Sequence, residues 1–249
     1  MSTSVCGALL LLACSEQVAA SDAEDHRPFV PEGLANTELE GEGGLTLVAF
    51  TLQQRGSGLE LLATVRHDGD EPACEPGILS HFVDRAGLLQ ATVGATVYGG
   101  EHYRLDGEAG TLVRCLRPGE LGMAALVDLP DSVVLGELAY LQHTFPAFTL
   151  AGLSPVDRAL TLSTAAVGSG YEGTLTNGLG VAVAEPKVAV FPVNRVNRPL
   201  GVATSSAQLE LLPSEKWSFA TTLVPERGVD HAAYALVSLT GDQAQANRE

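Results

Sequence analysis

The sequence predicts an all-β protein that contains an internal duplication, and two observations carry this prediction. Its apolar runs are short, alternate with polar residues and are divided by Gly, Pro, Asn or Asp, whereas no window of about ten residues has a convincing helical period. In addition, a strand that follows a Glu-Pro dipeptide occurs twice, within 74–85 and within 184–195, and both segments end in Val-x-Arg.

The two copies correspond at further points along the chain. Their opening strands are expected at 45–50 and 160–162, and an Asx-Gly dipeptide follows the next short strand of each copy, at Asp68 and at Asn177. Asx-Gly is a strong turn signal because both residues tolerate positive φ. Matches that recur in the same order along the chain indicate an internal duplication.

One insertion distinguishes the copies. The offset between them is 110 residues at the Glu-Pro dipeptide, where Glu75 corresponds to Glu185, but 95 residues at a later Pro-x-Glu turn, where Glu120 corresponds to Glu215. The first copy therefore contains 15 extra residues, which fall within 89–116. Glycines and acidic residues in this segment predict an extended hairpin.

The spacing of the strands predicts the domain organisation. Roughly seven short strands in about 95 residues is the pattern of an immunoglobulin-like antiparallel β-sandwich. We therefore expect two tandem domains of this kind, with β-sandwich repeat 1 and its inserted hairpin at 44–150, β-sandwich repeat 2 at 151–242, and a disordered tail at 243–249. Because residues 150–153 are too apolar for a free linker, the junction should be packed.

The N-terminus predicts export. An apolar run at 5–12 is far too short to span a bilayer but suits a secretory signal. Residues 11–14, Leu-Leu-Ala-Cys, resemble a bacterial lipobox, which implies a lipoprotein signal peptide at 1–13 and acylation of Cys14. An ordinary cleaved signal and a buried apolar strand are the alternatives. Ser15 follows the cysteine, and it favours an outer-membrane location that faces the periplasm or the cell surface.

The charge of the chain excludes some partners. Residues 14–43 are polar and acidic and predict a flexible tether, because such a stretch cannot bury enough apolar area to offset its ordering entropy. The whole chain has 30 acidic and 14 basic residues and a formal net charge of −16. This balance excludes nucleic acid as a partner, because phosphate binding requires Lys and Arg. The predicted partners are the membrane, through the lipid anchor, and other envelope proteins or glycans.

Each copy resembles a domain of known proteins. The Asx-Gly turn is followed by an aromatic strand that ends in Asp or Asn, at 82–84 and at 191–194, and then by the Pro-x-Glu turn. Together these features resemble the FxLYD domain of bacterial envelope lipoproteins, over about 190 residues. The resemblance implies binding or spacer modules, and no catalytic residue carries over from it.

The cysteines that remain after processing at Cys14 predict a disulfide. They are Cys74 and Cys115, and an even count in an exported protein suggests that they are bonded. Cys74 precedes one strand and Cys115 follows the next, antiparallel strand, so both are expected at the same end of a sandwich. The loop of about 40 residues would contribute roughly 3–4 kcal/mol of stability. The alternative is two separate free cysteines.

Motifs for catalysis or metal binding are weak. The six histidines are scattered without zinc-ligand spacing, so we expect neither a metal site nor a cofactor. Clustered oxygens at 68–71 could bind calcium, although a solvated acidic turn is the simpler interpretation. Ser154, Ser163 and Ser169 lack the context of a hydrolase elbow.

The sequence thus leads to two hypotheses on function. The first is a lipid-anchored, non-enzymatic binding or spacer module of the bacterial cell envelope. The alternative is an envelope enzyme of the hydrolase type, with its site at the junction of the two β domains near 145–155. A pocket at the junction that holds two or more titratable groups with perturbed pKa values would favour the enzyme.

Overall fold

The computed structural model describes residues 35–38, 44–55, 58–105, 112–157, 159–168, 170–207, 210–223 and 229–239. The expected signal peptide at 1–13, the lipidation site Cys14 and the tail at 243–249 lie outside these residues. In the described part, the regular elements are β-strands apart from one 3-10 turn, which confirms the predicted all-β class. Within the same ranges, no helix has the length and apolar character that crossing a membrane requires.

The first half of the molecule, β1 to β10, contains two sheets that enclose a core. The strand order is β2-β3-β9 in one sheet and β1-β10-β5-β6 in the other. Side chains from both sheets, including Leu61, Phe82 and Leu141, are fully buried between them. The elements are β1 (Ala35–Glu38), β2 (Leu45–Arg55), β3 (Gly58–His67), β4 (Ala73–Cys74), β5 (Gly77–Asp84), β6 (Leu89–Thr96), β7 (Glu101–Leu105), β8 (Leu112–Leu116), β9 (Leu121–Leu126), η1 (Leu135–Glu137) and β10 (Leu138–Thr144).

The second half, β12 to β17, repeats this arrangement. Its sheets have the orders β12-β13-β16 and β15-β14-β17, which match β2-β3-β9 and β6-β5-β10. Tyr171, Leu175 and Val188 lie in the core between them. The elements that follow β10 are β11 (Leu153–Pro155), β12 (Leu160–Val167), β13 (Gly170–Asn177), β14 (Val183–Val193), β15 (Ala203–Ser206), β16 (Lys216–Ala220) and β17 (Asp230–Leu239).

Single hydrogen bonds follow the offsets of the sequence repeat. The Asp84 carboxylate accepts hydrogen bonds from the amides of Ala86 and Leu88. In the second half, the Asn194 side chain accepts hydrogen bonds from the amides of the two corresponding residues, Val196 and Arg198. In the Pro-x-Glu turns, Glu120 accepts from the amide three residues earlier, and Glu215 does the same. Side chains at corresponding turn positions therefore form corresponding hydrogen bonds in both halves.

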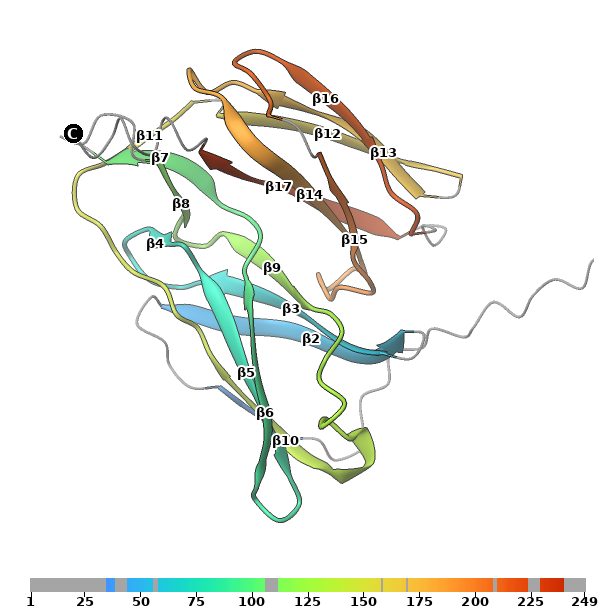
Figure 1. Ribbon diagram of the computed structural model, residues 1–249. Helices are drawn as coiled ribbons and strands as arrows, with labels where there is room; N and C mark the ends of the chain where they lie inside the picture. The colour runs from blue at the N-terminus through green and yellow to red at the C-terminus, as the bar shows by residue number, and fades with distance from the viewer. Residues whose placement is uncertain are drawn as a thin grey trace, which may run out of the picture.

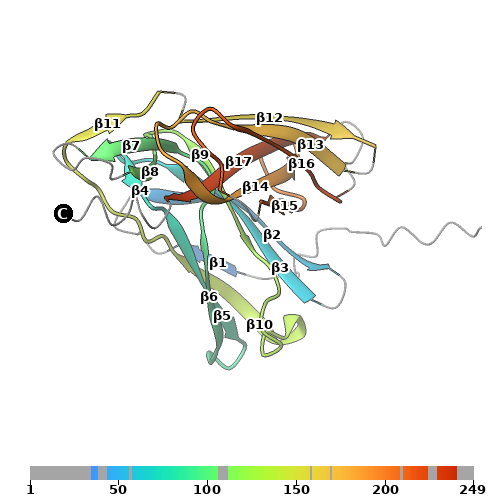
Figure 2. The same ribbon diagram turned by 45° about the horizontal axis from the view of Figure 1, so that its top comes forward.

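A small third sheet lies at one end of the molecule, beside both halves (Figure 2). Its order is β11-β7-β8-β4, and β7 pairs with β8 as an antiparallel hairpin within the segment where the insertion was predicted. Two predicted boundaries need correction here. β11 lies in the predicted second repeat, yet it pairs with β7 of the first half. Residues 35–38, predicted as part of the flexible tether, form β1, which pairs with β10 in parallel.

The two halves pack through the outer faces of β2-β3-β9 and β15-β14-β17, so that four sheets are stacked (Figure 1). A shared apolar cluster joins Leu62, Tyr98 and Met123 to Phe191 and its neighbours on β14. β3 and β14 are therefore buried on both faces, which explains their nearly continuous apolar sequences.

A polar ladder borders the apolar cluster between the halves. Alternate residues of β2 point to the same face of the strand, and they donate to backbone carbonyls of the second half. Thr51 Oγ1 donates to Pro199 O at 2.8 Å, and Arg55 Nη1 donates to Val202 O at 3.0 Å. Between them, Gln53 Nε2 lies 3.3 Å from Leu200 O. Leu150 and Leu153, in the segment where the sequence predicts a packed junction, pack on the disulfide of the third sheet. The larger contact between the halves is made by this ladder and the apolar cluster.

Candidate site: a charged cleft between the two halves

A cleft of about 460 Å³ lies between the third sheet and the second half. Charged side chains from both halves line it, together with an apolar wall. The lining residues are Glu75, Thr96, His102, Leu112, Arg114, Glu185, Lys187, Leu236 and Val237. The cleft therefore brings together the insertion of the first half and the Glu-Pro motifs of both halves.

Both glutamates of the repeated Glu-Pro motif lie at the rim of this cleft. Glu75 and Glu185 have φ values of 45° and 47°, in the left-handed region that non-glycine residues seldom adopt. At Glu185 the pairing of β14 with β17 shifts register, and at Glu75 the chain passes from β4 to β5. The same local deviation of the strand thus presents a solvent-exposed carboxylate from each half.

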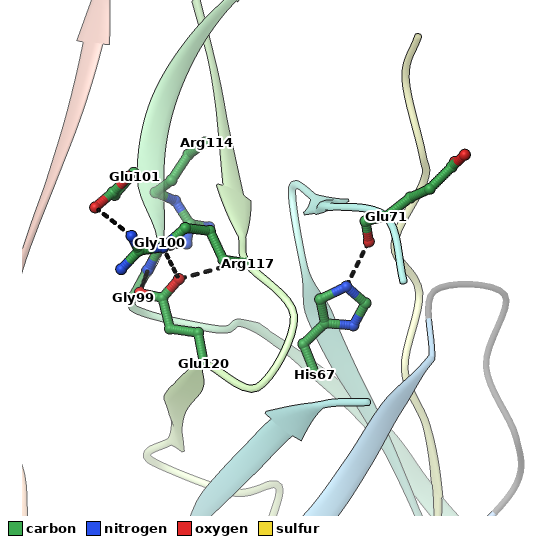
Figure 3. A network of polar contacts seen from close by, with 8 residues as sticks. All are labelled: His67, Glu71, Gly99, Gly100, Glu101, Arg114, Arg117 and Glu120. Atoms are coloured by element: carbon green, nitrogen blue, oxygen red, sulfur yellow. Dashed lines mark hydrogen bonds and ion pairs between the residues drawn. The ribbon is translucent and has the colours of Figure 1, made fainter. Parts of the chain in front are cut away.

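Arg114 of β8 is the most buried charged residue of the cleft, with 5% of its surface exposed. Its Nη1 donates to the carbonyl of Gly99, as Figure 3 shows, whereas Nη2 is buried and has no hydrogen-bond partner among the described residues. Burial lowers the pKa of Arg114, and the nearby Glu75 opposes this shift. A buried guanidinium nitrogen without an acceptor is unfavourable.

The disulfide holds Glu75 and Arg114 side by side. Cys74 and Cys115 are bonded, as predicted, with an S–S distance of 2.04 Å. They are direct cross-strand neighbours on β4 and β8, and the prediction that the bridge joins the strand ends of a sandwich was wrong. Because Glu75 follows one cysteine and Arg114 precedes the other, Glu75 Oε1 can accept from the Arg114 amide at 3.0 Å.

His102 and Lys187 complete the charged lining. His102 is half-buried on β7, and burial, with a smaller contribution from Arg114, lowers the pKa of its imidazole. Burial therefore favours the neutral form of the ring. Lys187 lies on β14, two residues after Glu185, with its Nζ 6.0 Å from the ring centroid of Tyr98. The cleft thus contains two acidic side chains, Glu75 and Glu185, and two basic side chains, Arg114 and Lys187.

A second polar network supports the hairpin that carries Arg114 (Figure 3). Glu120 accepts from the amides of Gly100 and Arg117 at 3.2 and 2.9 Å, and Arg117 also pairs with Glu101 at 3.3 Å. Gly100 has a φ of 85°, and a Cβ there would lie 2.5 Å from Cys115 O. This position requires glycine because the turn packs directly on the disulfide strand.

The other candidates from the sequence have structural roles. Asp68 pairs with Arg66, whose guanidinium lowers the pKa of the carboxyl to about 2. Figure 3 shows the Glu71 carbonyl beside His67 Nε2. Among the described residues, no three His, Cys, Asp or Glu side chains are grouped as a metal site would need. The acidic turn at 68–71 therefore forms internal contacts.

A Ser-His pair was not visible in the sequence. Ser80 Oγ lies 2.9 Å from His143 Nδ1 across the paired strands β5 and β10, and both residues are fully buried. A nucleophile with no solvent access cannot meet a substrate, so this pair belongs to the core. Only the strand register brings the two residues together.

The enzyme alternative placed a site near 145–155, and the charged cleft lies elsewhere. Phe145 is buried in the core of the first half. A signal for the position of the cleft was present in the sequence, namely the Glu-Pro dipeptide that recurs at Glu75 and Glu185. Its partner Arg114 could not be selected without knowing that β4 pairs with β8.

Comparisons with known proteins leave the family open. No protein-family model matches the chain, and no curated protein matches it either. A red sea bream transglutaminase is 11% identical with a TM-score of 0.21, over 79% of this chain and 31% of that chain. The class 5 fimbriae chaperone CfaA is 12% identical with a TM-score of 0.19, over 82% of this chain and 96% of that chain. The chain spans about a third of the transglutaminase, and both TM-scores are too low to bear on fold or function.

Proposed function

We propose that this protein is a lipid-anchored, non-enzymatic module of the bacterial cell envelope, which binds other envelope components or spaces them. The lipobox-like segment that ends at Cys14 supports the anchor. The resemblance of each copy to the FxLYD domain of envelope lipoproteins supports the class of module. The proposed location is the outer membrane, facing the periplasm or the cell surface.

The observation that carries the proposal is the packing of the two halves into one stack. Leu62 and Phe191, from different halves, are both fully buried in the shared cluster. The polar ladder from Thr51 to Arg55 adds directional contacts beside it. A stack fixed in this way can hold a binding cleft at a constant geometry beyond an N-terminal tether, as a binding or spacer module requires.

The anchor is tested by detergent partitioning of the full chain expressed in a bacterium with two membranes. The wild-type protein should enter the detergent phase, and Cys14→Ala should move it to the aqueous phase. Cys6→Ala is the matched control, because it removes a cysteine from the same apolar segment but leaves the lipobox intact. Retention of Cys14→Ala in the detergent phase would contradict the lipoprotein assignment.

A second candidate function is an envelope hydrolase that uses the same cleft. It is favoured by two lining residues, His102 and Arg114, whose pKa values are both lowered by burial. A neutral imidazole near the Glu75 carboxylate can act as a general base. The test is turnover of chromogenic esters, glycosides and peptides by the wild-type protein and by His102→Ala. Turnover that His102→Ala abolishes would favour the enzyme, and absence of turnover across the panel would favour the binding module.

A further inference from the structure

We propose that the second half binds an extended, basic segment of another protein, which adds as a strand to the outer edge of β17. This inference rests on the proposed binding function and names the kind of partner. It starts from an edge that the first half covers with its own chain, whereas the described residues of the second half leave it unpaired.

β17 has one edge that pairs with β14 and one that pairs with no strand of the described chain. Ala233 and Ala235 pack toward the core of the second half. Tyr234 and Leu236 pack toward the cluster between the halves. Both faces of the strand are therefore covered, and every second residue directs its backbone N–H and C=O groups to the unpaired edge.

Two clefts lie along this edge, and together we call them the edge groove. The charged cleft is lined by Leu236 and Val237, and a second cleft of about 470 Å³ is lined by residues 233–235. Consecutive residues of a strand point to opposite faces, so a cleft that touches them in succession lies beside the edge of the strand. His102 lines both clefts, and Figure 1 shows the end of β17 beside the third sheet that carries it.

A second strand edge borders the edge groove. Residues 160–162 of β12 also line the second cleft, and β12 is the outer strand of its sheet in the described part of the chain. The groove therefore lies where both sheets of the second half end. A strand placed there would form backbone hydrogen bonds with β17 and would cover Leu160 and Leu162, which are partly exposed.

The first half shows how such an edge is covered. β10 corresponds to β17, and β1 pairs in parallel with its outer edge at residues 140–143. By the strand pairings, these residues correspond to 230–233, where the edge groove begins. The segment with the same spacing before β12 is 150–153, but it leads into β11, which pairs with β7. The described part of the second half thus supplies no covering strand of its own.

The rim of the edge groove favours a basic partner. Glu75, Asp157 and Glu185 line the groove, and all three are exposed. Of the described Lys and Arg residues that line it, Arg114 is buried, so that only Lys187 offsets these charges at the surface. Lysine or arginine side chains on an added strand would pair with the exposed carboxylates.

Fluorescence anisotropy of the full chain with a labelled peptide tests the proposal. The probe is Lys-Thr-Val-Thr-Val-Thr-Lys with blocked ends, and it should bind saturably because recognition of an added strand depends on the peptide backbone and on the terminal charges. Replacement of both lysines by glutamate should weaken binding at least tenfold. No saturable binding of the lysine peptide, or equal affinity for the glutamate peptide, would overturn the proposal.

Amide hydrogen exchange measured by NMR locates the peptide. An added strand bonds to every second residue, so alternate amides within 233–237 should exchange at least tenfold more slowly in the complex. Amides of the central strand β13 serve as the control and should not change. Peptide binding that leaves the exchange of β17 unchanged would place the peptide elsewhere and overturn the proposal.

Variants test the contribution of the rim. The double variant Asp157→Asn/Glu185→Gln should weaken peptide binding about tenfold. Asp131→Asn/Glu172→Gln is the matched control, because both residues are exposed and lie outside the edge groove. This control should bind as the wild type does. Equal losses for the two double variants would show a general attraction of charge and would contradict a partner held at this rim.

The outcomes separate this inference from the function on which it rests. A second copy of the chain is the other possible occupant, and sedimentation of the full chain in detergent should show a monomer. A dimer in which the amides of β17 are protected would assign the edge to a second copy and overturn the proposal. The anchor is measured independently by the partitioning of Cys14→Ala, so a peptide that fails to bind removes the partner class and leaves the anchor untouched.

Discussion

His67 and Asn177 form the same hydrogen bonds at the same position of the two halves, so Asn177 corresponds to His67 and not, as the match of the Asx-Gly turns predicted, to Asp68. His67 Nδ1 lies 3.3 Å from the amide of Gly69, and Nε2 lies beside the carbonyl of Glu71. Asn177 Oδ1 accepts from Leu179 N at 2.9 Å, and its Nδ2 donates to Val181 O at 2.9 Å. Each side chain therefore binds the backbone two and four residues later, and both are buried.

This equivalence predicts that asparagine can replace the histidine. His67→Ala would leave the Gly69 amide and the Glu71 carbonyl without their partner, at a loss of about 1–3 kcal/mol in the free energy of unfolding. His67→Asn should lose less, because an amide side chain forms both bonds at the corresponding turn. Urea unfolding of the wild type and both variants measures the difference. Equal losses for the two variants would show that the turn does not depend on these bonds.

His143 should make stability fall in mild acid. Burial, with a smaller contribution from His81, lowers its pKa from 6.5 to about 4. Between these values the unfolded chain is protonated and the folded chain is not, so protons favour unfolding. The contribution of His143 to the free energy of unfolding is complete above about pH 6.5 and falls as the pH drops. Near pH 4 the free energy of unfolding should be lower by about 3 kcal/mol.

The control for this prediction is His143→Asn, which offers Ser80 a polar partner that does not titrate. The free energy of unfolding should decrease less between neutral pH and pH 4 in this variant than in the wild type. A residual decrease is expected, because the pKa of His102 is also lowered. Parallel pH profiles for the wild type and His143→Asn would contradict the assignment.

Loss of the disulfide should destabilise the protein. Cys74 and Cys115 are 41 residues apart in the sequence, and removal of a native bridge of this kind typically costs about 2–5 kcal/mol. The double variant Cys74→Ala/Cys115→Ala should therefore unfold at a lower temperature than the wild type. Reductant should lower the wild-type transition toward that of the double variant and leave the variant unchanged. A shift of the double variant by reductant would mean that another process is being measured.

The two halves should unfold together unless their junction is disrupted. Trp217 is the only tryptophan and lies in the second half, so its fluorescence reports that half, whereas far-ultraviolet dichroism reports both. The unfolding curves measured by fluorescence and by dichroism should coincide in the wild type. Phe191→Ala should lower the free energy of unfolding by about 3–5 kcal/mol, because Phe191 is fully buried in the shared cluster. In this variant the two unfolding curves should separate.

Phe82→Ala is the matched control for the junction. Phe82 is equally buried, but it lies in the core of the first half. This variant should lower stability while both probes still report one transition. Separate transitions in the wild type would show that the junction does not couple the halves.

The sequence determined the features that depend on short segments. By the offset of 110 residues Ala73 corresponds to Val183, and by the offset of 95 residues Leu116 corresponds to Leu211. Ala73 pairs with Leu116, and Val183 forms the corresponding bridge with Leu211. The all-β class, the disulfide partners and the inserted hairpin could be predicted because alternation, turn residues and cysteine count are local properties of the chain.

Tertiary structure alone decided which surfaces meet. The strand β1 was not predicted, because four polar and small residues carry little strand signal without β10 beside them. β11 crosses the predicted boundary for the same reason, since only its pairing with β7 defines it. The charged cleft depends on Arg114 of β8 facing Glu185 and Lys187 of β14. Residues so far apart in sequence meet only when the outer faces of two sheets pack together. The alternation of apolar and polar residues along a strand shows that one face is apolar, but it does not show which surface covers that face.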